Sequence, residues 1–170
     1  MLARNETIFK WALYAGATMV FFLLQGAVLQ RISLWGVIPF VFPILAAVLG
    51  MYEGPLPGSI YGLVLGVLCD LLLPASIPCF YTLVFPVAGL CAGLISQSLL
   101  PAGFLCAAFT SVLAFFLTDA FHCFLLWARE KAAWAAGARL FLQEVCISIL
   151  LIIPVVLLFS AVFRRTHLDD

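Results

Sequence analysis

Six apolar runs, each 16 to 24 residues long, divide this chain and limit what it can fold into. An α-helix needs about 20 apolar residues to cross the hydrocarbon core of a bilayer. The sequence therefore predicts an all-α fold, a polytopic membrane bundle of six transmembrane helices joined by short loops. The predicted spans, which together form one membrane domain over residues 1–170, are residues 11–29, 34–51, 58–73, 80–99, 104–127 and 140–163.

Composition excludes several other classes of protein. Hydrophobic residues make up 66% of the chain and charged residues only 9%, whereas a soluble domain carries about 25% charged residues. Six spans leave no room for a soluble domain. The net charge is zero and the eight basic residues are dispersed, so nothing indicates nucleic-acid binding.

Basic residues are the sequence signal for the orientation of the chain in the membrane. The first apolar run is too long for a signal-peptide core and offers no small-x-small cleavage site, so we expect it to be a retained span. With both termini on one side, the count of basic residues is equal: Arg4, Lys10, Arg164 and Arg165 against Arg31, Arg129, Lys131 and Arg139. We favour cytoplasmic termini because basic residues bracket the first and last spans directly.

Proline and glycine positions predict irregularities between and within the spans. Pro39 and Pro43 predict a kinked second span, because prolines are tolerated in membrane helices when neighbours satisfy the freed carbonyls. The run 54–58 contains two prolines between two glycines and predicts a tight turn. Residues 128–139 form a short, partly charged and alanine-rich segment, in which Trp134 is suited to lying at the membrane interface.

A stripe of small residues ends in an acid in the third span. Gly58, Gly62, Gly66 and Asp70 recur every fourth position, and residues four apart share a helix face. Such a stripe permits close backbone contact with another helix, and an acid in a membrane helix costs about 2.5–3.5 kcal/mol on insertion scales. The fourth span carries a second small pair, Gly89 and Gly93. These six residues are predicted to serve either partner binding or helix packing.

A second group of polar residues is predicted to share one depth in the membrane. Because successive spans run in opposite directions, Asp70, Asp119, His122 and Glu144 fall in the half that carries the loops after spans one, three and five. Glu53 falls at the opposite face. One interpretation is a polar cavity or partner-binding surface lined by Asp70, Asp119, His122 and Glu144, with the last three as the candidate cavity residues. The alternative is that Asp119 and His122 satisfy each other while Glu144 reaches the interface.

No pattern predicts catalysis. Asp70 and Asp119 raise the possibility of an aspartic peptidase, but the motifs that surround the two aspartates of lipoprotein signal peptidases are missing. The six cysteines are scattered without a CxxC pair, which indicates free thiols, and no His, Cys or carboxylate spacing suits a metal. We expect neither an enzyme nor a cofactor.

The run from Tyr61 to Leu73 resembles the most recognisable stretch of the rod-shape-determining MreD family, which has a G-x-x-x-G-x-x-x-D-L-L pattern. The size, the six-span plan and the proline-containing second span are also similar. The resemblance implies a multi-pass protein of the bacterial inner membrane. It would be a non-catalytic scaffold that contacts an MreC-like partner and, through it, MreB and the peptidoglycan synthases. Such a scaffold should present Gly62, Gly66 and Asp70 to a partner helix.

MreD-like proteins also resemble the six-helix substrate-binding S subunits of energy-coupling-factor vitamin transporters. This resemblance implies an alternative, in which the chain binds a vitamin in a pocket. A subunit of that kind should enclose a pocket of several hundred Å³ with convergent polar groups. The two interpretations therefore differ in where the glycine stripe points and in whether the interior is hollow.

Overall fold

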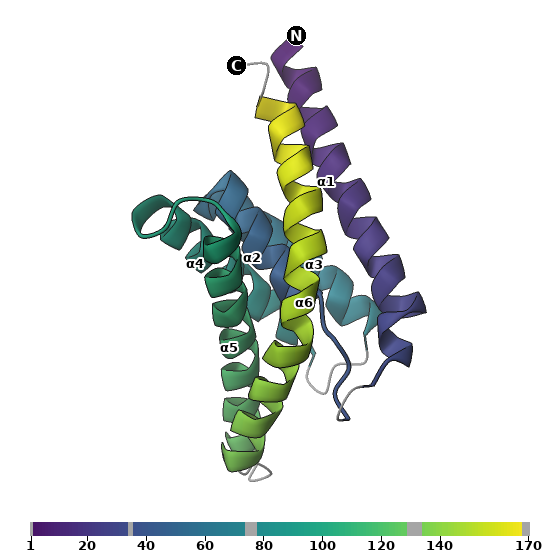
Figure 1. The fold of residues 1–170 in the computed structure, drawn as a ribbon, viewed down its shortest axis with the longest axis vertical. Helices are drawn as coiled ribbons and strands as arrows, with labels where there is room; N and C mark the ends of the chain where they lie inside the picture. Colours follow the sequence, from purple (N-terminus) through teal and green to yellow (C-terminus); the bar gives the residue numbers. More distant parts are fainter. Residues whose placement is uncertain (1, 34–35, 74–77, 129–133, 168–170) are drawn as a thin grey trace.

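The computed structural model describes residues 2–33, 36–73, 78–128 and 134–167. In these ranges the chain forms six α-helices and one short 3₁₀ turn, and five of the helices are long and apolar enough to cross a membrane (Figure 1). The predicted all-α membrane bundle is confirmed. The elements are α1 (Leu2–Ala27), η1 (Leu29–Arg31), α2 (Phe42–Glu53), α3 (Pro55–Leu72), α4 (Phe80–Ser98), α5 (Phe104–Ala128) and α6 (Trp134–His167).

The second span differs from its prediction. A helix was expected over residues 34–51, but α2 begins only at Phe42 and has 12 residues, which gives a length of about 18 Å. Pro43 lies in its first turn, where the missing N–H removes no helical hydrogen bond. The residues just before α2, 36–41, are not helical. The expected kink is therefore a complete break.

Side chains from two other helices satisfy the backbone of this non-helical segment. Gln25 on α1 donates from Nε2 to the carbonyl of Pro39 over 2.8 Å and accepts the N–H of Val41 at 3.1 Å. Ser148 on α6 accepts the N–H of Phe40 at 3.3 Å. Irregular backbone at membrane depth is tolerated only where protein or water supplies hydrogen bonds, and these two side chains do so.

The short α2 is the centre of the bundle. Every residue from Phe42 to Met51 is buried, and α3, α4, α5 and α6 all contact it. Six non-helical residues can extend up to about 20 Å, so segment 36–41 and α2 together are long enough to cross a bilayer. Successive crossings of the membrane therefore still run in opposite directions. Both chain ends lie on the same side of the molecule, as Figure 1 shows.

Two further boundaries differ from the prediction. The expected turn over residues 54–58 is reduced to Gly54 alone, at φ +94°, because Pro55 and Pro57 already lie in the first turns of α3. The expected interfacial segment, residues 128–139, lies partly outside the described residues, at 129–133. From Trp134 onward it forms the start of α6, which continues without interruption for 34 residues.

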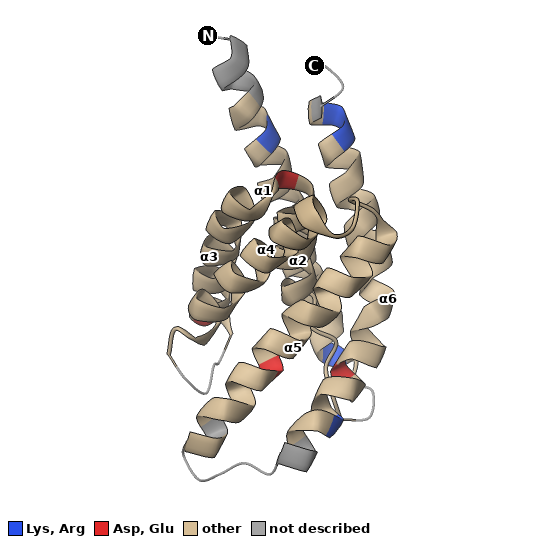
Figure 2. Cartoon of the chain, turned by 90° about the vertical axis from the view of Figure 1, so that its left-hand side faces the viewer, with Lys and Arg blue, Asp and Glu red and all other residues tan. Residues whose placement is uncertain are grey.

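Charged residues lie in two separate layers of the bundle, one near the chain ends and one in the opposite half (Figure 2). The acidic residues of α3, α5 and α6 lie in the half away from the chain ends, as the alternation of spans predicts. Glu53, on the side of the termini, forms an ion pair with Lys10 on α1 and accepts the hydroxyl hydrogen of Tyr14 at 2.8 Å. This network joins the first helix to the end of α2.

Candidate functional site

The glycine stripe of α3 lies directly against the backbone of α4. A Cβ atom built at Gly66 would lie 2.5 Å from the carbonyl oxygen of Tyr81, and one at Gly62 would lie 2.7 Å from the carbonyl carbon of Phe85. Real Cβ atoms essentially never approach other heavy atoms this closely. Only a hydrogen atom fits at either position, so the stripe sets the distance between the two helices.

The contact is reciprocal and extends to α2. A Cβ atom at Gly58 would lie 2.9 Å from the carbonyl oxygen of Gly89 and 2.5 Å from the Cα of Gly50. On α4, Gly89 and Gly93 face the backbone of Gly58 and Pro55 in turn. Three helices therefore meet at glycine, and we call the whole set of contacts the glycine seam: Gly50, Gly58, Gly62, Gly66, Gly89 and Gly93.

The seam decides between the two roles predicted for these residues. Gly58, Gly62, Gly66, Gly89 and Gly93 are all buried inside the chain, where they serve helix packing. This corrects the expectation that a scaffold presents Gly62, Gly66 and Asp70 to a partner helix. The face carrying these residues is already covered by α4, which leaves no room there for a partner helix.

Asp70 lies one helical turn beyond Gly66 on α3, and its carboxylate caps the start of α4. Its carboxylate accepts the backbone N–H groups of Tyr81 and Thr82, at 3.1 and 2.9 Å, and the hydroxyl hydrogen of Thr82 at 2.6 Å. The first N–H groups of a helix lack intrahelical partners, and a negative charge there is also favoured by the helix dipole. The intramembrane acid therefore has a structural role, because it supplies from α3 the cap that α4 lacks locally.

The three residues predicted to line a polar cavity come together. Asp119 and His122 on α5 and Glu144 on α6 line one cavity of about 500 Å³. Its remaining walls come from the end of α1, η1, the non-helical segment before α2, the residue after α3, the start of α4, and α5: Gln25, Gln30, Ile38, Phe40, Leu73, Phe80, Tyr81 and Thr118. Asp70 was also expected to line this space, and that expectation is wrong, because its carboxylate is turned to the start of α4.

The carboxyl oxygens at this cavity differ in whether they have a hydrogen-bond partner. The carboxyl groups of Asp119 and Glu144 lie within hydrogen-bonding reach of each other. The second carboxyl oxygen of Asp119, Oδ2, is buried and has no hydrogen-bond partner among the described residues. The expected Asp119–His122 pair is not among the hydrogen bonds of the described ranges. The His122 ring instead packs on Phe80, with ring centroids 5.4 Å apart.

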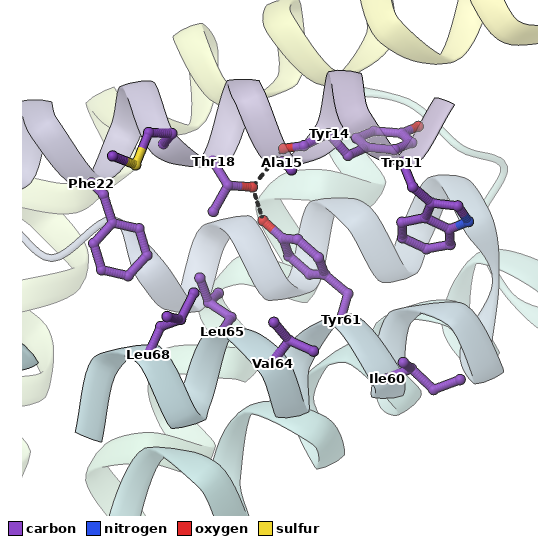
Figure 3. A pocket seen from close by; sticks show the side chains of 11 residues that line it. Trp11, Tyr14, Ala15, Thr18, Phe22, Ile60, Tyr61, Val64, Leu65 and Leu68 are labelled. Carbon is purple, nitrogen blue, oxygen red and sulfur yellow. Dashed lines mark hydrogen bonds between the residues drawn. The ribbon is translucent and has the colours of Figure 1, made fainter. Parts of the chain in front are cut away.

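A third feature is an apolar groove between α1 and α3, with a volume of about 310 Å³ (Figure 3). Thr18 and Tyr61 bridge it through their hydroxyls at 2.5 Å, and Thr18 also donates to the carbonyl of Tyr14 at 2.7 Å. Because threonine has one hydroxyl hydrogen, Tyr61 must be the donor to Thr18. Sequence reasoning missed this pair, as it missed Gln25 and Ser148, since a single polar residue in an apolar helix does not indicate its partner.

Within the described ranges, no group of three or more His, Cys, Asp or Glu side chains is arranged to hold a metal ion. All six cysteines are free. Comparison of the chain with protein-family models, with curated proteins and with solved structures gives no match.

Proposed function

We propose that this chain is a non-catalytic membrane scaffold of the MreD type, in the inner membrane of a bacterium, supporting cell shape and side-wall peptidoglycan synthesis. One observation carries the proposal. The residues through which the chain resembles MreD, Gly62, Gly66 and Asp70, are the residues that join α3 to α4. The recognisable motif therefore builds a rigid helix pair and leaves no side chain of its own for chemistry.

The proposed partner is an MreC-like protein, which would connect the chain to MreB and to the peptidoglycan synthases. Because α4 covers the glycine seam, this partner would contact an outer face of the bundle. The five span-length helices leave large apolar side chains exposed, as expected for surfaces that contact lipid or a partner helix.

Co-purification and cell shape test the scaffold proposal together. The chain should co-purify with the MreC-like protein of its own genome and should restore rod shape to a rod-forming bacterium that lacks its MreD. The double variant Asp119→Asn/Glu144→Gln is the control, because it changes the cavity and leaves the seam intact. It should still bind the partner and restore rod shape. A correctly inserted wild-type chain that neither binds the partner nor restores shape would contradict the proposal.

A second function is favoured by the polar cavity. A volume of about 500 Å³ with convergent polar side chains is within the range of small-molecule sites. The alternative proposal is a substrate-binding S subunit of an energy-coupling-factor vitamin transporter. In that case the purified chain should retain a vitamin that mass spectrometry detects, whereas a stable preparation without ligand favours the scaffold.

A further inference from the structure

The cavity between α5, α6 and the break before α2 has a chemical character that the scaffold proposal does not use. Three side chains that can carry a charge line it, namely Asp119, His122 and Glu144, and no lysine or arginine is among the described residues of its wall. All other acidic side chains of described geometry have partners elsewhere: Asp70 caps α4 and Glu53 pairs with Lys10. Uncompensated acidity is thus concentrated in this one space.

The two carboxyl groups are arranged so that a cation would be favoured between them. They lie within hydrogen-bonding reach of each other, and two carboxylates this close repel when both are ionised. Asp119 Oδ2 is buried and unpartnered among the described residues. A cation that enters the cavity would offset the repulsion between the two carboxylates.

Aromatic side chains form another part of the wall. Phe40, from the non-helical segment, packs on Tyr81, with ring centroids 5.6 Å apart, and Phe80 packs edge-on against Tyr81 at 5.1 Å. Aromatic faces attract cations and also accept flat apolar groups. Phe40 reaches this wall from the non-helical segment before α2. Gln25 and Ser148 hold the backbone of that segment in place.

From the cavity, its two adjacent carboxyl groups and its aromatic wall, we infer that this site binds a small organic cation, an amine or amidinium joined to a flat apolar group. The cationic N–H groups donate to Asp119 and Glu144, and the flat group lies against Phe40, Phe80 and Tyr81. The volume, about 500 Å³, is large enough for a whole small molecule. The inference does not depend on the scaffold proposal, and it names a ligand class for the vitamin-binding alternative.

The test compares two probes of nearly the same shape on the purified full-length chain in lipid nanodiscs. 4-Aminobenzamidine is a cation, and 4-aminobenzamide is its neutral counterpart. We expect saturable binding of the amidine, followed by its fluorescence, and binding of the amide weaker by about tenfold or more, because hydrogen bonds to ionised groups are the stronger ones. This comparison needs no variant and therefore does not depend on whether a mutant folds.

Isosteric variants then locate the site. Asp119→Asn and Glu144→Gln should each weaken amidine binding by about tenfold, since each removes one charged acceptor. Glu53→Gln is the matched control, an acid-to-amide change outside the cavity, and should leave the affinity unchanged. Equal binding of the two probes, no saturable binding of the amidine, or equal affinity in wild type and the Asp119→Asn/Glu144→Gln double variant would each overturn the inference. None of these results bears on co-purification with an MreC-like partner.

Discussion

Helices α3 and α1 both carry glycines, yet the structure uses them in opposite ways. On α3, a Cβ atom at Gly58, Gly62 or Gly66 would collide with the backbone of a neighbouring helix. On α1, a Cβ atom at Gly16 or Gly26 would have no neighbour within 4 Å. A small residue at helical spacing thus permits close packing without requiring it. The two helices differ because the backbone of a neighbouring helix approaches the glycines of α3, whereas no described neighbour approaches Gly16 and Gly26 on α1.

The comparison extends to the polar contacts that accompany each helix. Where α3 meets α4, Asp70 makes three hydrogen bonds that cap α4. Where α1 meets α3, the described side chains that line the groove are joined by the hydrogen bond between Thr18 and Tyr61. The α3–α4 pair is therefore fixed by backbone contact and a charged cap, whereas the α1–α3 contact is bordered by an apolar groove. Substitutions in the two regions should differ accordingly.

The largest effect is expected at the glycine seam. Gly62→Ala adds a methyl group where the backbone of Phe85 leaves no space, so helices α3 and α4 must separate. Overpacking of this kind typically costs about 1–3 kcal/mol, and a contact with backbone belongs at the upper end of that range. Thermal unfolding in detergent should show a clear loss of stability for Gly62→Ala. An unchanged midpoint would mean that α3 and α4 are not in close contact.

A smaller effect is expected from the cap. Asp70→Ala leaves the N–H groups of Tyr81 and Thr82 without their acceptor, and a lost partner of this kind costs about 1–3 kcal/mol. Hydrogen exchange should become faster in the first turn of α4. Thr82→Val is the matched control because it removes only the hydroxyl hydrogen bond, and it should lose about 1 kcal/mol. Equal losses from the two variants would contradict a role for the carboxylate as backbone cap.

The hydrogen bond between the hydroxyls of Thr18 and Tyr61 should contribute less to the stability of the fold than the Asp70 cap. Tyr61→Phe removes the donor to Thr18 and leaves the ring in place, for an expected loss of about 0.5–1.5 kcal/mol. Faster hydrogen exchange should be confined to the middle of α1, with α4 unaffected. If α4 is affected as strongly as α1, the two regions are coupled more closely than the structure indicates.

The smallest effect is expected at Gly16. Alanine there meets no neighbour, and in a helix interior alanine is favoured over glycine by about 0.8–1 kcal/mol. Gly16→Ala should leave the unfolding midpoint unchanged or raise it slightly. A loss comparable to that of Gly62→Ala would remove the contrast between α1 and α3.

The sequence predicts the parts of this fold that depend on local hydrophobicity. Apolar runs locate five span-length helices, and the alternation of crossings places Asp119, His122 and Glu144 in the same half of the membrane. The start of α2 could not be predicted, because it depends on Gln25 and Ser148, which lie on α1 and α6. The same limit applies to the glycines. Their spacing predicts a close helix contact, but identifying α4 as the neighbour requires the tertiary structure.

The most direct test of the central claim, that the glycine seam builds the fold itself, is the stability of Gly66→Leu purified without any partner. A leucine at this position would meet the backbone of Tyr81 and Thr82, so we expect the isolated variant to lose its cooperative unfolding transition, while Gly16→Leu keeps it. If isolated Gly66→Leu unfolds like the wild type and fails only to bind an MreC-like protein, the stripe serves a partner and does not hold the fold together.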